Sequence, residues 1–165
     1  MPDMLVNLLR LPAVDPLLSE LGGAGVSVRR AQPWELTEVR VFVQGHFDAR
    51  WADEISVGFM RQPVSVFVAV RDGQLKGFAA YECTRRNFFG PTGVVEGERG
   101  RGLGRALLLA CLWAMREMGY AYAVIGGVGP AAFYERAVGA TPIAGSSPGV
   151  YADPLRRDDD EEGRT

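Results

Sequence analysis

The chain has 165 residues, of which 47% are hydrophobic and 23% charged. This composition is that of an average globular domain and excludes a wholly disordered chain. The net charge is −2, and the residues before the last ten contain 15 basic and 15 acidic side chains. A neutral body lacks the cationic surface that non-specific nucleic-acid binding requires, so we expect no nucleic-acid partner.

Membrane insertion and metal chemistry are also disfavoured. The longest uninterrupted apolar run, Ala106–Met115, is too short to cross a bilayer. The first residues lack the basic start and apolar core of a signal peptide, so we expect a cytoplasmic protein without membrane association. Cys83 and Cys111 form no CxxC pair and His46 is the only histidine, so we expect no metal site and no Ser-His-Asp triad.

The hydropathy pattern divides the chain into three parts. Leucines interrupted by Pro12 and Pro16 predict short helices that end at Gly22-Gly23, so residues 1–25 are interpreted as a helical N-terminal extension. The main domain is predicted to span residues 26–155. The charge-dense residues 156–165 are interpreted as a disordered tail.

Within the main domain, strands and helices alternate. The spacing of apolar residues, prolines and glycines predicts, in chain order, a strand at 26–30, helices from Pro33 to Phe47 and at 52–61, strands at 64–70, 74–81 and 88–95, a long buried helix from Gly102 to Gly119, a strand at 120–125, a helix at 131–137 and a terminal strand pair at 141–143 and 149–151. Asp72-Gly73 is a strong hairpin signal between two of these strands. This order indicates a mixed α/β sheet with helices on both faces.

The most informative segment is the glycine-rich turn Arg99–Ala106 before the long helix. Its glycines allow a ligand to approach the backbone, and the first turn of a helix presents N–H groups without internal partners. Such a site binds phosphate or diphosphate, and the three arginines of the turn can pair with it. The sequence does not fit a Rossmann fingerprint, because Arg105 or Leu107 stands where glycine or alanine is needed, and it has no Walker A lysine.

The pattern that does match is Arg-x-x-Gly-x-Gly, formed by Arg99, Gly102 and Gly104. A second block runs from Ile125-Gly126-Gly127 to Phe133-Tyr134 and Gly139. On these two motifs the chain resembles the GNAT superfamily of N-acetyltransferases over roughly residues 26–151. The resemblance implies the GNAT-like acyl-CoA N-acyltransferase fold, a mostly antiparallel central sheet with helices on both faces, and acetyl-CoA as co-substrate.

The resemblance also implies a set of site residues. Tyr134 would be the general acid that protonates the coenzyme A thiolate. The cofactor-binding residues would be Val94, Val95, Arg99, Gly100, Arg101, Gly102, Leu103, Gly104, Arg105 and Phe133. The general base stays open among Glu82, His46 and Glu54, since the strand at 88–95 offers no glutamate before its end. Trp34 and Trp51 are either core residues or cleft walls.

We therefore expect an acetyl-CoA-dependent N-acetyltransferase that acts by direct attack of a primary amine in a ternary complex. The alternatives are an acyl-CoA-binding regulatory module without turnover and a structural or partner-binding domain. A small-molecule amine or amino sugar is favoured over a protein amine as acceptor. The resemblance is compatible with a homodimer, because relatives often pair through sheet edges or helices.

Overall fold

The computed structural model describes residues 1–155, so the predicted tail at 156–165 lies outside the described residues. The strands are β1 (Met4–Asn7), β2 (Val26–Arg30), β3 (Val66–Arg71), β4 (Gln74–Tyr81), β5 (Phe88–Val94), β6 (Tyr122–Ile125) and β7 (Thr141–Pro142). The α-helices are α1 (Asp15–Gly23), α2 (Leu36–His46), α3 (Ala49–Phe59), α4 (Leu103–Glu117) and α5 (Ala131–Val138). Short 3-10 turns include η3 (Glu96–Glu98) and η4 (Gly149–Tyr151).

Within residues 1–155 the strands form one sheet of seven, in the order β2-β3-β4-β5-β6-β1-β7. Neighbouring strands are antiparallel except β5 and β6, which are parallel. The Asp72-Gly73 turn joins β3 to β4, as predicted, with Asp72 and Gly73 at positive φ. The mixed α/β fold predicted from the sequence, with a mostly antiparallel sheet, is thus confirmed.

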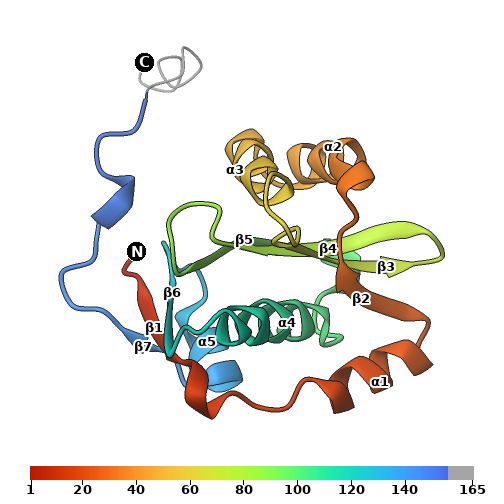
Figure 1. Cartoon of the computed structure of the whole chain (residues 1–165), viewed down its shortest axis with the longest axis horizontal. Helices are drawn as coiled ribbons and strands as arrows, with labels where there is room; N and C mark the ends of the chain where they lie inside the picture. Colours follow the sequence, from red (N-terminus) through yellow and green to blue (C-terminus); the bar gives the residue numbers. More distant parts are fainter. Residues whose placement is uncertain (156–165) are drawn as a thin grey trace.

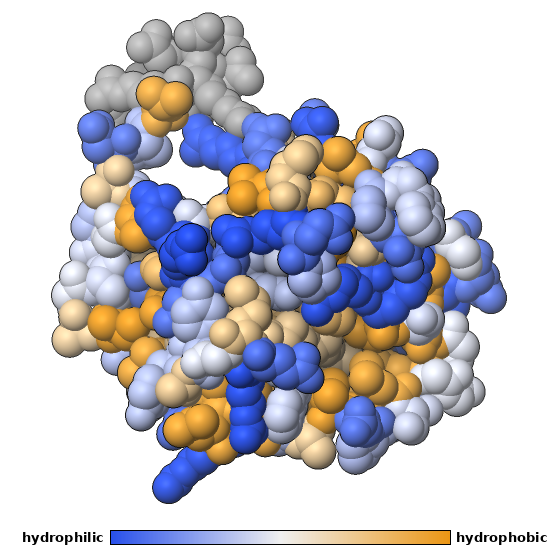
Figure 2. Space-filling model, in the orientation of Figure 1, coloured by the Kyte–Doolittle hydropathy of each residue, from blue (hydrophilic) through white to orange (hydrophobic). Residues whose placement is uncertain are grey.

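Helices cover both faces of the sheet (Figure 1): α2 and α3 lie on one side, and α1, α4 and α5 on the other. The alternation of side chains along β3 and β4 builds a separate core on each side. Val66, Val68 and Phe78 point toward α2 and α3, whereas Ala69 and Ala79 point toward α4. The outer surface in the view of Figure 2 mixes hydrophilic and hydrophobic residues without one broad apolar area.

Helix α4 is the central element of the larger core. It is buried nearly all round, as its sequence predicts, with Leu107, Leu109, Leu112 and Met115 fully inaccessible. In the part of the chain that the structure covers, none of the helices combines the length and apolarity needed to cross a membrane.

Leu112 offers a direct test of this core. Replacing Leu112, which is 0% exposed, with alanine should lower the free energy of unfolding by about 2–5 kcal/mol, because the α4 core would be left with a cavity. Chemical denaturation measures the change. The matched variant Val41→Ala, on the exposed side of α2 where the side chain is 65% accessible, should change stability by less than about 0.5 kcal/mol. Equal losses in the two variants would contradict the assigned core.

Two sequence predictions require correction. Residues 4–7 were expected to be helical, but they form strand β1, which lies between β6 and β7 and pairs with both. The helical prediction holds for α1. Residues 149–151 were expected to form a strand, but they form the 3-10 turn η4. At β1 distant partners decide the conformation, since Leu5 faces Val124 and Thr141 across the sheet.

Candidate functional site

Strands β5 and β6 form a fork. They pair only at Phe88–Val124 and Phe89–Ile125, and beyond Phe89 the strand β5 continues along β4 alone. The hydrogen bond from Val95 N to Lys76 O fixes the alternation of this antiparallel pair. The backbone groups of Thr92 and Val94 therefore point away from β4 and into the gap, where the Val94 carbonyl accepts a 3.2 Å hydrogen bond from Arg99 Nε. This exposed strand edge can bond an extended chain that bears amides.

The glycine-rich loop closes one end of the gap. Gly100 and Gly102 have φ of +77° and +88°, a conformation that glycine adopts readily and that turns the chain into α4. A Cβ atom on Gly104 would lie 3.7 Å from Val94 Cγ2 and 3.9 Å from Phe133 Cζ, both in residues that line the cleft. The absence of a side chain at Gly104 therefore leaves its backbone open to the cleft. The N–H groups of the first turn of α4 are thus available to an anion.

These parts surround a cleft of about 500 Å³, a volume within the usual range for small-molecule sites. Eight of the predicted site residues line it: Val94, Arg99, Gly100, Gly102, Gly104, Arg105, Phe133 and Tyr134. The other lining residues are Phe47, Trp51, Phe89, Thr92, Gly93, Glu98, Leu108 and Pro130.

Three predicted cofactor-binding residues do not line the cleft. Both backbone groups of Val95 are already used, since its N–H donates to Lys76 and its carbonyl accepts from Glu98 N. The Leu103 side chain is buried in the core. Arg101 points outward and forms a 3.5 Å ion pair with Glu98, which also binds Arg71 at 2.6 Å.

Tyr134 lies on α5, at the boundary between the core and the cleft. It is 7% exposed and packs edge-on against Phe133 and Phe89, with ring centroids 5.0 and 6.4 Å away. Burial raises the pKa of Tyr134 above its ordinary value of 10.0. The phenol is therefore protonated at neutral pH and can donate a proton.

Beyond Tyr134 the cleft continues into two smaller hollows of about 220 and 410 Å³. Trp51 and Phe89 line all three spaces, so the cleft and the two hollows adjoin one another, and we refer to the three together as the channel. Trp51 stacks on Phe47, and a Cβ atom on Gly93 would come within 2.5 Å of the Phe47 ring. Glycine at position 93 thus lets Phe47 lie across β5 and hold Trp51 as a cleft wall, which settles one question the sequence left open.

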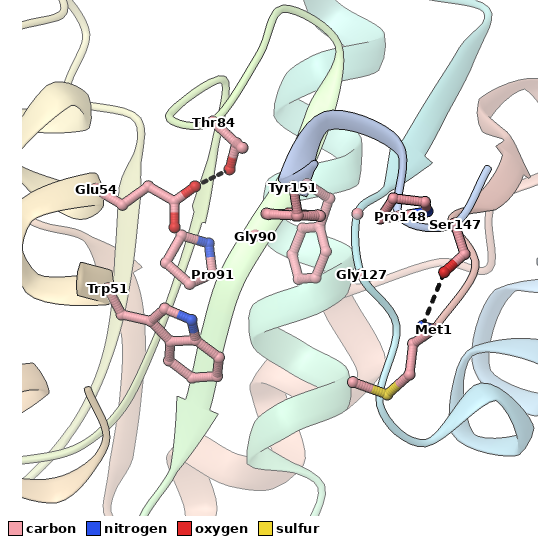
Figure 3. Close-up of a pocket in the computed structure, with 12 residues that line it drawn as sticks. Met1, Trp51, Glu54, Thr84, Gly90, Pro91, Gly127, Ser147, Pro148 and Tyr151 are labelled. Carbon is pink, nitrogen blue, oxygen red and sulfur yellow. Dashed lines mark hydrogen bonds between the residues drawn. The ribbon is translucent and has the colours of Figure 1, made fainter. Parts of the chain in front are cut away.

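Glu54 stands at the far end of this channel. It projects from α3 into the 410 Å³ hollow, which we call the acceptor pocket, and its Oε1 accepts a hydrogen bond from Thr84 Oγ1 (Figure 3). Burial raises the pKa of the Glu54 carboxyl above 4.5, and this outweighs the Thr84 hydrogen bond and the charge of Arg85, which lower it. Of the three candidate bases, Glu54 alone lines the channel.

The other two candidate bases lie elsewhere. Glu82 is 2% exposed and lines a separate pocket, where Tyr120 Oη, Arg61 and the backbone N–H of Asn87 all bond its carboxylate. His46 is exposed at the end of α2, 4.8 Å from the Phe42 ring centroid. Neither side chain borders the cleft or the acceptor pocket.

Neither cysteine lines the cleft or the hollows beyond it. Cys83 and Cys111 are buried, and burial raises the pKa of Cys83 to about 11 and that of Cys111 well above 9.0. Both are therefore thiols at neutral pH and poor nucleophiles. Over residues 1–155, no three of the His, Cys, Asp and Glu side chains gather closely enough to hold a metal ion.

Comparison with known proteins agrees with this arrangement. Residues 62–137 match the family model described as the acetyltransferase (GNAT) domain, and this stretch contains β5, the glycine-rich loop and Tyr134. A search of curated protein sequences gives no match.

Solved structures share the fold. One is a GCN5-related glucosamine N-acetyltransferase region of a fungal multi-domain GH3 β-N-acetylglucosaminidase (TM-score 0.69, 17% identity, 86% of this chain and 19% of that one). A second is a GCN5-related N-acetyltransferase from Sphaerobacter thermophilus (TM-score 0.65, 19% identity, 86% of this chain and 48% of that one). A third is a GNAT family acetyltransferase from Brucella melitensis in complex with acetyl-CoA (TM-score 0.52, 20% identity, 67% of this chain and 80% of that one). The chain thus spans less than half the length of the first two proteins.

The fold and the matched stretch define the class as an acyltransferase domain. More specifically, residues 62–137 match the GNAT acetyltransferase domain and solved GNAT structures share the fold, which confirms the resemblance inferred from the two glycine motifs. Acetyl-CoA is the acyl donor of this family, and the cleft between β5 and the start of α4 offers both an amide-bonding edge and an anion-binding helix end.

Proposed function

We propose that the protein transfers the acetyl group of acetyl-CoA to a small primary amine by direct attack within a ternary complex. One observation carries the proposal: the cofactor cleft, which Tyr134 lines, and the acceptor pocket, which Glu54 lines, adjoin one another and share Trp51 and Phe89 as walls. A domain that only bound acyl-CoA would need the cleft but no second pocket with a half-buried carboxylate.

On the donor side, the diphosphate would lie on the N–H groups of the glycine-rich loop and the first turn of α4, where Arg99 and Arg105 add positive charge. The pantetheine amides would bond the backbone groups of Thr92 and Val94, extending the sheet into the fork. These contacts would bring the thioester beside Tyr134.

On the acceptor side, the amine must lose a proton because an ammonium ion has no lone pair. Glu54 would accept this proton, directly or through a water molecule, and its raised pKa makes it a stronger base than an exposed glutamate. The nitrogen would then attack the thioester carbonyl carbon. When the C–S bond breaks, the nitrogen would release its second proton to solvent, while Tyr134 would donate its hydroxyl proton to the departing sulfur and be reprotonated from solvent.

The acceptor pocket suits a compact monoamine. Trp51 and Pro91 offer apolar surface for its carbon skeleton, and Glu54 offers one negative charge for its ammonium group. Amino sugars are the first class to test, since the fungal region with the same fold is described as a glucosamine N-acetyltransferase. The cytoplasmic location and the homodimer expected from the sequence stay predictions.

Replacing Tyr134 with phenylalanine tests the proposal. The variant should keep its fold and its affinity for acetyl-CoA, because the ring contacts remain, while kcat falls about 10²-fold, a typical loss for a positioned acid. Coenzyme A release is measured with a panel of primary amines that includes glucosamine. Tight acetyl-CoA binding without release from any amine, and no effect of Tyr134→Phe, would support the binding module instead. No stabilisation by acetyl-CoA would support a purely structural domain.

A further inference from the structure

The outer wall of the acceptor pocket is built by a segment that the GNAT motifs do not include. Residues 146–151, which we call the strap, follow β7 and cross the pocket, so that Ser147, Pro148 and Tyr151 line it. Figure 3 shows Tyr151 facing Glu54 and Trp51 from the opposite side of the pocket. Trp51 and Glu54 of α3 and Tyr151 of the strap thus line the acceptor pocket from opposite sides.

Tyr151 lies closely against the backbone between β6 and α5. A Cβ atom on Gly126 would lie 2.8 Å from Tyr151 Oη, and one on Gly127 would lie 3.1 Å from Tyr151 Cε2. A side chain at Gly126 would therefore force the Tyr151 or Phe88 side chain, or both, to shift. The two glycines, which the sequence offered only as part of a family motif, also form the seat of this ring.

Asp3 fastens the strap to that seat. Asp3 is only 6% exposed, and its Oδ1 accepts a 2.8 Å hydrogen bond from Gly127 N. Its own N–H donates to Ser146 Oγ at 2.8 Å, and its carbonyl accepts from Ile143 N at 2.8 Å. A carboxylate is costly to bury without such partners, so one residue connects the β6–α5 loop with both ends of the turn that starts the strap.

The charges around Tyr151 agree with this placement. Burial raises the pKa of Tyr151 first, and the nearby carboxylates Glu54 and Asp3 raise it further. The phenol is therefore neutral at physiological pH. The wall opposite the base is an aromatic ring rather than a second charge.

From these contacts we propose that Tyr151 is the specificity-determining residue of the acceptor pocket, limiting the size of the primary amine that the pocket accepts on its strap side, and that Asp3 is a positioning residue for Tyr151. This inference rests on the proposed acetyl transfer, since it names the substrate class of the same channel. With Tyr151 in place the pocket measures about 410 Å³ and is bounded on the opposite side by Trp51 and Glu54. Removing the ring would open the pocket toward solvent on the strap side.

The test compares benzylamine, with one ring, and 1-naphthylmethylamine, with two fused rings. Tyr151→Ala should raise the ratio of kcat/KM for the larger amine to that for the smaller one by at least tenfold. Tyr151→Phe, which keeps the ring, should retain the wild-type ratio, and KM for acetyl-CoA should not change in either variant. An unchanged ratio in Tyr151→Ala would overturn the assignment.

Asp3 is tested through the same ratio. Asp3→Ala should shift the amine preference in the same direction as Tyr151→Ala, because the strap loses its hydrogen bond to Gly127. Asp3→Asn keeps an oxygen that can accept this bond and should restore most of the wild-type preference. A loss of thermal stability in Asp3→Ala with no change in preference would show a structural role only and overturn the positioning role.

A binding measurement separates failure of this inference from failure of the proposed function. Calorimetric titration of the two amines into the coenzyme A-saturated protein gives a ratio of Kd values that needs no turnover. If the wild type acetylates neither amine but Tyr151→Ala still shifts the Kd ratio tenfold toward the larger amine, the proposed acetyl transfer is wrong while the role of Tyr151 in amine selection is supported. Equal Kd ratios in both proteins, or no binding of either amine by either protein, would overturn the role assigned to Tyr151.

Discussion

Glu54→Gln is expected to lower kcat for amine acetylation by about 10²- to 10⁴-fold, which is the usual contribution of a positioned base. Glutamine keeps the shape of the side chain and an oxygen that can accept the Thr84 hydrogen bond, but it cannot accept a proton. KM for acetyl-CoA should change little, since Glu54 lies at the opposite end of the channel from the glycine-rich loop. Steady-state kinetics with saturating acetyl-CoA measure the loss.

The neighbouring residue Asp53 provides the matched control. Its carboxylate lies on the same helix, is 67% exposed and forms only a 3.5 Å ion pair with Arg40. Asp53→Asn removes the same charge and should leave kcat within about twofold, because an exposed pair of this kind contributes little. Equal losses in Asp53→Asn and Glu54→Gln would show a general charge effect and would contradict the role of Glu54 as base.

The pH dependence follows from the same environment. Because burial raises the pKa of Glu54, the carboxyl is protonated and inactive as a base below that pKa, so kcat should fall as the pH decreases through a value above 4.5. In Glu54→Gln this acidic limb of kcat should disappear. Folding disfavours the charged form of Glu54, so the side chain stabilises the fold only at low pH, and this contribution is lost as the pH rises through its folded pKa. Glu54→Gln should therefore not be less stable than the wild type at neutral pH.

The second large effect is expected from Gly104→Ala in the cofactor cleft. The backbone of Gly104 is helical, and the added methyl would have only ordinary contacts, 3.7 Å from Val94 and 3.9 Å from Phe133. The fold should therefore tolerate alanine, but the methyl would occupy the space through which the diphosphate reaches the N–H groups of α4. Affinity for acetyl-CoA should fall at least tenfold, or about 1.4 kcal/mol.

Gly45→Ala is the corresponding control. Gly45 is also helical, within α2, and a Cβ atom there would have no neighbour within 4 Å. Both variants should retain or slightly raise the melting temperature, since alanine is the better helix former. Only Gly104→Ala should weaken acetyl-CoA binding in calorimetric titration. An unchanged affinity in Gly104→Ala would place the diphosphate outside the glycine-rich loop.

The parts of the fold that local sequence determines were predictable. The Asp72-Gly73 turn needs residues that accept positive φ, and the alternation along β3 needs only its own side chains. Helix α4 follows from the unbroken apolar run Ala106–Met115, which lies between Gly102 and Gly119. Strand β1 was not predictable in this way, because four residues followed by two leucines fit a helix as well as a strand until β6 and β7 pair with them.

The site residues likewise divide into those that local motifs predict and those that depend on tertiary contacts. The glycine motif predicted the anion-binding loop because backbone geometry depends on glycine itself, and Tyr134 came with the second motif. Choosing Glu54 over Glu82 and His46 required the orientation of α3 against the sheet, which no local pattern encodes. Asp3 and Tyr151 were missed since their roles arise from contacts between the two ends of the described chain.

A crystal structure of the protein with coenzyme A tests the central claim most directly. We predict that the diphosphate binds the backbone N–H groups of residues 100–104 at the start of α4, and that the pantetheine chain lies along Thr92 and Val94 with its sulfur beside Tyr134. Coenzyme A bound with its diphosphate away from this loop, or with its sulfur outside the channel that leads to Glu54, would contradict the account.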